Sequence, residues 1–236
     1  MTRAEHVKHY ALTLVLPLLL MLGLTYGAGR LILEARTGEA ATNGDLAGER
    51  TSLWNTLTDF GSSLSDTPYI VALTAIAVIV FRLVLKRWRE SIFLVVAVWS
   101  QSLIFLTTTV LIDRERPPVP HLDPAPPTSS FPSGHVSAAV AFYCGLALIL
   151  STHVRHRALQ VVIWVLGVAA PLIVGFSRLY RGMHFPTDVA WGMLLGAVCV
   201  VVAARAILYR RHEGARPRLA SRDDPEGVSP GRAAPR

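Results

Sequence analysis

Long apolar runs separated by short polar segments dominate the pattern along the chain. Six runs occur, at roughly residues 10–33, 68–86, 91–112, 135–151, 158–177 and 188–209. A helix needs about 20 mainly apolar residues to cross a bilayer. The fourth run is the shortest and carries Ser and Tyr, which suits a helix buried within a bundle. The pattern predicts an all-α protein, a polytopic membrane bundle with six transmembrane helices.

Composition supports a membrane protein. The 236 residues are 52% hydrophobic and only 17% charged, whereas a soluble domain carries about 25% charge. The first run is longer than the h-region of a signal peptide and no convincing small-residue cleavage site closes it, which favours an uncleaved anchor. Cys144 and Cys199 lie inside apolar runs; we interpret them as packing residues without disulfide or metal spacing.

The distribution of positive charge predicts the topology. The net charge of +7 could suggest nucleic acid, but the basic residues gather in alternate connections, at 86–89, 155–157 and after 209. Positive loops stay in the cytoplasm, so both termini are expected inside the cell membrane and segments 34–67, 113–134 and 178–187 outside. The expected partners are the bilayer and a lipid substrate, with no nucleic acid; the sequence does not indicate the oligomeric state.

Three parts are expected along the chain: residues 1–67 as an anchor helix and outer loop, 68–211 as the bundle core, and 212–236 as a disordered basic cytoplasmic tail. Segment 113–134 is rich in proline, which predicts a stiff, extended loop. Within 34–67, five apolar residues follow one helical face, as a membrane-surface helix or as a cap on the bundle. These residues are Leu53, Trp54, Leu57, Phe60 and Leu64.

The sequence Pro-Ser-Gly-His at 132–135 opens the fourth run. Pro132 suits the first turn of a helix, Ser133 and Gly134 leave the backbone open, and His135 is the only strong proton-transfer group there. An ordinary helix start with one interfacial histidine is the alternative interpretation.

A second polar cluster precedes the sixth run. His184 and Asp188 are four residues apart, with Pro186 at the expected first turn of the last helix. A helical turn from His184 would place both side chains on one face. Asp188 could then accept a proton from one imidazole nitrogen and leave the other free to attack. An ordinary His–Asp contact at a helix start is the alternative.

Arginines occur on the same outer loops, against the positive-inside bias, at 114, 116, 178 and 181. The guanidinium fork matches phosphate oxygens, and the starts of two helices offer free amides to an anion. A nucleophile, a proton donor, an orienting carboxylate and anion clamps together predict phosphoryl transfer at the outer face, without a metal cluster or another cofactor.

These residues resemble the three motifs of the type 2 phosphatidic acid phosphatase superfamily of membrane lipid phosphatases. The second motif is complete at 132–135, and the third is complete at Ser177, Arg178, His184 and Asp188. The first motif has Arg116-Pro117, but Thr109 stands at its lysine position. The resemblance covers roughly residues 68–209.

The resemblance implies a role for each matching residue. His184 would form a phosphohistidine, Asp188 would orient it, and His135 would protonate the leaving oxygen. Arg116, Ser133, Gly134 and Arg178 would hold the phosphoryl oxygens. Arg114, or else Arg181, is expected to supply the charge that Thr109 lacks.

The expected function is a metal-independent hydrolase of a lipid phosphate or diphosphate. An outward-facing site favours a polyprenyl diphosphate, with phosphatidylglycerophosphate and phosphatidic acid as other candidates. Three alternatives stay open: a vanadate-dependent haloperoxidase, a non-catalytic lipid-binding protein and a transporter. Haloperoxidases of this type are larger and soluble, and a transporter more often carries polar residues and helix breaks in mid-span.

Overall fold

The computed structural model describes residues 2–35 and 38–209, and the regular structure in these ranges is helical throughout. Within them, six helices are long and apolar enough to cross a membrane. They span Arg3–Ala35, Thr67–Val84, Arg89–Leu111, Gly134–His153, Arg157–Tyr180 and Pro186–Leu208. The predicted six-span α-helical bundle is confirmed, and the chain is a multi-span integral membrane protein.

Short π-helical turns and two additional helices complete the described fold. The turns at Ala11–Val15 and Val140–Cys144 join consecutive α-helices into one span, and the turn at Ala204–Leu208 extends the last helix. The α-helices are α1 (Arg3–Tyr10), α2 (Leu16–Ala35), α3 (Ala40–Gly48), α4 (Ser52–Ser63), α5 (Thr67–Val84), α6 (Arg89–Leu111), α7 (Gly134–Ala139), α8 (Gly145–His153), α9 (Arg157–Tyr180) and α10 (Pro186–Ala203).

The first span begins earlier than its apolar run predicts. Thr2 and Glu5 form a capping box, in which the Thr2 hydroxyl accepts from the Glu5 amide and the Glu5 carboxylate accepts from the Thr2 amide. This reciprocal cap satisfies two amides that a helix start leaves unpaired. The polar residues before position 10 therefore continue the membrane helix.

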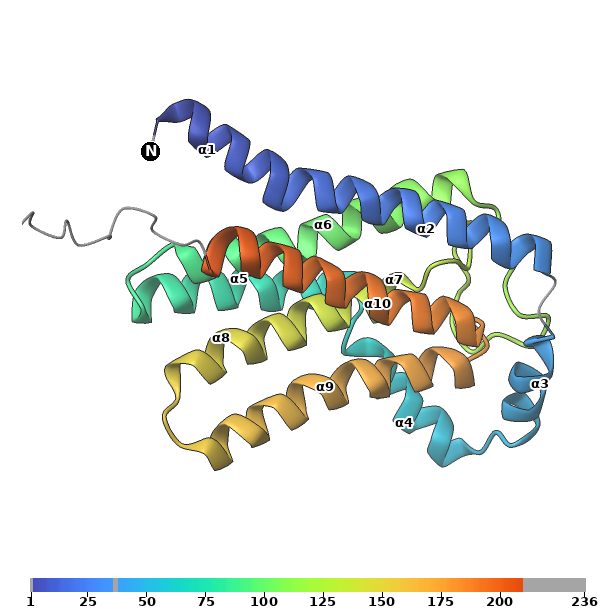
Figure 1. Cartoon of the computed structure of the whole chain (residues 1–236). Coiled ribbons are helices and arrows are strands. Elements are labelled where there is room, and N and C mark those ends of the chain that lie inside the picture. Colours follow the sequence, from blue (N-terminus) through green and yellow to red (C-terminus); the bar gives the residue numbers. More distant parts are fainter. Residues whose placement is uncertain (1, 36–37, 210–236) are drawn as a thin grey trace, which may run out of the picture.

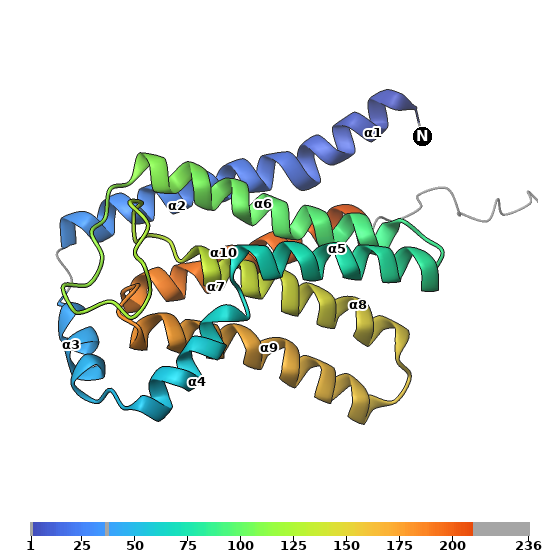
Figure 2. The same cartoon turned by 180° about the vertical axis from the view of Figure 1, so that it is seen from behind.

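The two ends of the bundle differ in what they carry (Figure 1). At one end, here called the termini end, the first and last spans meet, and His9 Nε2 lies 3.3 Å from the Ala206 carbonyl oxygen. The opposite end, here called the loop end, carries α3, α4 and the segments 112–133 and 181–185 (Figure 2). The sequence predicted that successive connections would lie at opposite ends of the bundle, with segments 34–67, 113–134 and 178–187 at the same end, and the structure has this arrangement. The predicted tail, 212–236, lies outside the described residues, so the three-part division stays a prediction.

Close packing of α7 against α10 fixes where the loop-end chemistry lies. A Cβ atom at Gly192 would stand 2.7 Å from the Ser133 carbonyl oxygen, and one at Gly196 would stand 2.6 Å from the Ser137 carbonyl oxygen. Only glycine allows the two backbones to approach this closely. The start of α7 is therefore held directly against the first half of α10.

Helix α4 presents its apolar face outward. The side chains on that face are largely exposed, with Leu53 and Phe60 each about two thirds accessible, whereas Thr58, Gly61 and Ser62 are buried. A Cβ atom at Gly61 would lie 2.3 Å from Ser177 Oγ, so the small polar face of α4 packs along α9 (Figure 2). Of the two interpretations left open by the sequence, this geometry favours the membrane-surface helix over the apolar cap.

Candidate active site

The loop end brings the second and third motifs together through the backbone. The Ser133 amide donates to the Asp188 carbonyl oxygen at 3.0 Å, and His184 Nδ1 lies 2.7 Å from the Ser130 carbonyl oxygen. The Arg116 guanidinium donates to the Met183 carbonyl oxygen at 2.7 Å. Segments that are more than 50 residues apart in sequence thus form one site.

His184 is held as a neutral ring. A carbonyl oxygen can only accept, so Nδ1 carries the proton toward Ser130, and Nε2 keeps its lone pair. The side chain is buried, and its pKa is lowered to about 4, mainly by burial, with a contribution from the charge of Arg178 and an opposing one from Asp188. At neutral pH the imidazole is therefore uncharged, the form that a nucleophile requires.

The predicted hydrogen bond between His184 and Asp188 is not present. Nδ1 lies 3.7 Å from Asp188 Oδ2, which is beyond hydrogen-bond distance. His184 lies before α10, which begins at Pro186, so the two residues do not share a helical face. The Ser130 carbonyl oxygen takes the position that the sequence assigned to the carboxylate, and Asp188 acts on His184 as a nearby charge.

Asp188 is fully buried and has two partners of its own. Its Oδ2 atom accepts from the Phe185 amide at 2.8 Å, and Oδ1 accepts from the Arg114 guanidinium. The Thr187 amide donates to Glu39 Oε2 at 2.9 Å. Two carboxylates of the protein therefore already cap the start of α10, and the prediction that this helix start offers free amides to phosphate is wrong.

The guanidinium of Arg114 contacts the buried carboxylate of Asp188. Besides Asp188, its guanidinium donates to Thr187 Oγ1 at 2.8 Å and lies 3.5 Å from Glu39 Oε1. Its Cζ atom stands 4.3 Å from the centre of the Phe185 ring. Arg114 is therefore a buried side chain with charged and polar partners at the loop end.

Thr109, at the lysine position of the first motif, faces its own helix. Its hydroxyl donates to the Leu106 carbonyl oxygen at 2.9 Å, a local bond typical of threonine inside helices. This hydroxyl is therefore already used within α6. Direct phosphate binding by Arg114 in place of the lysine stays a prediction.

Four buried polar atoms in this region have no hydrogen-bond partner within residues 2–35 and 38–209. Three are Ser133 Oγ, Arg116 Nε and Arg178 Nε, and the fourth is Asn43 Oδ1, whose amide nitrogen donates to the His184 carbonyl oxygen at 3.1 Å. Burying an unpaired donor costs about 1–3 kcal/mol, so such atoms indicate a site that a ligand completes. The first three belong to residues that the sequence assigned to phosphoryl oxygens, and burial lowers the pKa of Arg116.

The start of α7 differs in detail from its prediction. The helix begins at Gly134, with Ser133 as its N-cap, so Pro132 precedes the helix instead of forming its first turn. The Ser133 side chain makes no cap hydrogen bond. A Cβ atom at Gly134 would lie 2.7 Å from the Phe105 ring, so no larger residue fits here without displacing that ring.

Several residues near the site were not identified from the sequence. Asp123 pairs with both Arg178 and Arg181, and Asp66 Oδ1 lies 3.1 Å from His135 Nε2. The capping preference of an aspartate before the Thr-Pro start of α5 was the one available signal for Asp66. Ser130 and Glu39 had no signal, because one acts through its backbone and the other lies far away in sequence.

The chain offers no metal site in its described part: residues 2–35 and 38–209 contain no group of three or more His, Cys, Asp or Glu side chains that could hold an ion.

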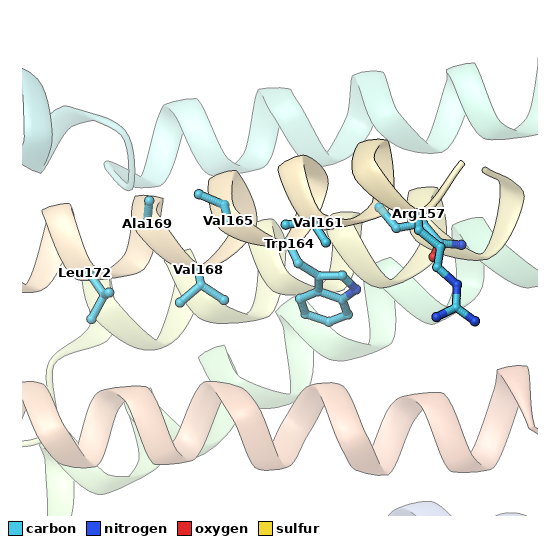
Figure 3. A pocket seen from close by; sticks show the side chains of 8 residues that line it. Arg157, Val161, Trp164, Val165, Val168, Ala169 and Leu172 are labelled. Carbon is cyan, nitrogen blue, oxygen red and sulfur yellow. The ribbon is translucent and has the colours of Figure 1, made fainter. Parts of the chain in front are cut away.

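An open groove of about 780 Å³ follows one face of α9 (Figure 3). It is separate from the residues described above. Its lining consists of Arg157, Gln160, Val161, Trp164, Val165, Val168, Ala169 and Leu172.

Residues 90–212 match the PAP2 superfamily. The chain is 37% identical over 76 residues to an undecaprenyl-diphosphatase of Sulfolobus acidocaldarius, covering 32% of each chain. It is 32% identical over 147 residues to phosphatidylglycerophosphatase B of Bacillus subtilis, covering 59% of this chain and 66% of that one. A lipid A 1-phosphatase of Rhizobium johnstonii is 31% identical over 86 residues, covering 34% of this chain and 31% of the relative. The match spans less than two thirds of the length of each relative.

Two solved structures share the fold. The crystal structure of a transmembrane PAP2-type phosphatidylglycerolphosphate phosphatase from Bacillus subtilis superposes with a TM-score of 0.73 at 22% identity, covering 83% of this chain and 96% of that one. The structure of Aquifex aeolicus LpxE gives a TM-score of 0.54 at 22% identity, with 68% and 90% covered. Both similarities concern the arrangement of the helices.

Proposed function

Because this chain belongs to the PAP2 superfamily, we propose that it hydrolyses a lipid phosphate or diphosphate through a phosphohistidine on His184. The observation that carries the proposal is the neutral, buried His184, whose proton is held on Nδ1 by Ser130. The unpartnered polar atoms of Ser133, Arg116 and Arg178 support it as donors awaiting phosphoryl oxygens.

In the first step, His184 Nε2 attacks the phosphorus atom and forms an N–P bond while the bond from phosphorus to the leaving oxygen breaks. His135 donates its proton to that oxygen. Arg116, Arg178 and Ser133 stabilise the charge on the phosphoryl oxygens, the kind of prearranged electrostatics that contributes most to such reactions.

In the second step, water attacks the phosphohistidine, the N–P bond breaks, and His135 takes the proton from the water. Inorganic phosphate leaves and both histidines return to their starting forms. Asp188 offsets the positive charge that His184 acquires while it is phosphorylated. The proposed steps use only side chains of this chain, so turnover should persist in EDTA.

The substrate class follows from the membrane setting and the relatives. The three curated relatives are named for undecaprenyl diphosphate, phosphatidylglycerophosphate and lipid A phosphate, each a phosphate on a lipid. We favour a polyprenyl diphosphate, because a site at the outer face suits recycling of a lipid carrier. Phosphatidylglycerophosphate and phosphatidic acid are the next substrates to test.

The proposed orientation puts the termini end in the cytoplasm and the loop end outside. Single cysteines at positions 120 and 155, in a chain without Cys144 and Cys199, test this with an impermeant thiol reagent on intact cells. Labelling at 120 alone supports the proposal. Labelling at 155 alone would place the site inside.

Phosphate release from defined lipids by the purified protein in detergent tests the function. The wild type should release phosphate, and quenching in alkaline detergent with labelled substrate should trap an acid-labile, base-stable phosphoprotein. His184→Gln should give neither signal. A folded wild-type protein that binds these lipids without releasing phosphate would favour the non-catalytic alternative.

A further inference from the structure

Asp66 lies at the corner between α4 and α5, outside the three motifs. It occupies the N-cap position of α5, where an aspartate normally accepts a hydrogen bond from an amide of the first turn. Its side chain makes no such bond. Instead, Oδ1 lies 3.1 Å from His135 Nε2. The Asp66 side chain therefore contacts the histidine at the start of α7 and does not cap α5.

The corner is fixed to α7 and the π-helical turn after it by two more hydrogen bonds. Ser65 Oγ donates to the His135 carbonyl oxygen at 2.6 Å, and the Tyr143 hydroxyl donates to the Leu64 carbonyl oxygen at 2.8 Å. The backbone on either side of the contact is therefore held in place. The contact between Asp66 and His135 therefore joins two segments whose backbones are already held together by these hydrogen bonds.

The surrounding charges leave Asp66 as the carboxylate for His135. The charges of Arg178 and Arg181 act on Asp66 and stabilise its carboxylate. Asp123 forms ion pairs with both arginines. The hydrogen bond with His135 lowers the pKa of Asp66, so its carboxylate is ionised at neutral pH.

We propose that Asp66 is a positioning residue for His135 that holds the ring through Nε2. Nδ1 is then the nitrogen that donates the proton to the leaving oxygen. This inference rests on the proposed function, because it assigns a partner to the proton donor of that reaction.

The experiment compares two substrates in each enzyme preparation. Phosphatidylglycerophosphate has an alkoxide leaving group that needs a proton, whereas p-nitrophenyl phosphate has a leaving group that does not. Asp66→Asn should lower turnover of the lipid about tenfold, a fraction of the whole general-acid contribution, and should change turnover of the aryl phosphate less than about threefold. Asp66→Glu should recover most of the loss.

The ratio between the substrates does not depend on the fraction of folded protein, so partial unfolding cannot mimic the result. Asp113→Asn removes an exposed carboxylate elsewhere at the loop end and should leave both rates unchanged. Equal losses of both substrates in Asp66→Asn would make Asp66 merely structural and leave the proposed function standing. A wild type that releases no phosphate from these two substrates, from phosphatidic acid or from a polyprenyl diphosphate would overturn the proposed function, and the inference with it.

Discussion

Two histidines at the loop end each lie near an aspartate, but the two pairs are built differently. His184 and Asp188 are four residues apart, and their side chains are 5% and 0% exposed. His135 and Asp66 are 69 residues apart, and their side chains are 27% and 42% exposed. The local pair is buried and its ring is 3.7 Å from the carboxylate; the distant pair is partly exposed and hydrogen-bonded at 3.1 Å.

The difference suits two opposite chemical tasks. Burial and a carbonyl partner favour the neutral form of His184, which provides a lone pair. The carboxylate bonded to His135 Nε2 leaves Nδ1 as the nitrogen that would donate a proton in the proposed reaction. The two environments therefore match the nucleophile and the proton donor of that proposal.

Substitution of the proposed nucleophile, His184, should have the largest effect. His184→Gln keeps a side chain that can donate to the Ser130 carbonyl oxygen but has no attacking nitrogen, so turnover should fall by about 10⁴-fold or more. Phosphate release and phosphoprotein trapping measure it, with the unfolding temperature as a control for the fold. Near-normal turnover in this variant would mean that the nucleophile lies elsewhere.

His135→Gln should have the next largest effect. A general acid contributes about 10²–10⁴-fold, and mainly when the leaving group is poor, so phosphatidylglycerophosphate should lose far more than p-nitrophenyl phosphate. Burst kinetics should show slower formation of the phosphoenzyme. If alkyl and aryl substrates lose equally, His135 binds the phosphate and another group supplies the proton.

The sequence was sufficient for the parts of this comparison that are local. The spans follow from runs of apolar residues, and His184 and Asp188 are close enough in the chain for their spacing to predict proximity. The main-chain partner of His184 was not predictable, since any residue at position 130 provides a carbonyl oxygen. Asp66 meets His135 only after α4 and α5 have packed, so its role depends on the tertiary fold.

The same limit explains contacts that the sequence did not predict. Phosphate binding by Arg114, predicted because it neighbours Arg116 in the chain, stays a prediction, but its contact with Asp188 arises only through folding. The apolar pattern of α4 correctly predicted a helix with two faces, yet a pattern cannot tell whether its apolar face meets protein or lipid. In a membrane protein both media are apolar, so burial in the bundle does not follow from hydrophobicity.

Substitution of Arg114 tests whether the buried pair of His184 and Asp188 needs the charged partner of Asp188. Arg114→Ala leaves Asp188 Oδ1 without its charged partner, which should lower kcat about 10–100-fold, the value of a charged hydrogen bond, with little change in KM. Arg157→Ala, in the α9 groove, is the matched control and should have normal kinetics. Thr109→Lys added to Arg114→Ala should restore little. Substantial recovery would show instead that Arg114 supplies charge directly to phosphate.

The smallest predicted effect is a dependence of folding stability on pH that arises from the buried imidazole ring of His184. The pKa of His184 is about 4 in the folded protein and near 6.5 when unfolded. Above pH 6.5 neither state binds a proton at this residue, so the free energy of unfolding does not depend on its titration. Between pH 6.5 and about 4 the unfolded state binds the proton and the folded state does not, so stability falls as the pH is lowered.

At pH 5 this linkage amounts to roughly 2 kcal/mol relative to pH 8, since one pKa unit corresponds to about 1.4 kcal/mol. Thermal unfolding of wild type and His184→Gln in detergent, at intervals from pH 8 to pH 5, measures it. Glutamine does not titrate, and the carboxylates common to both proteins cancel in the difference. The wild type should therefore lose a few degrees more in Tm on acidification than the variant. Parallel curves would mean that His184 takes up its proton equally in both states, and the neutral nucleophile would lose its physical basis.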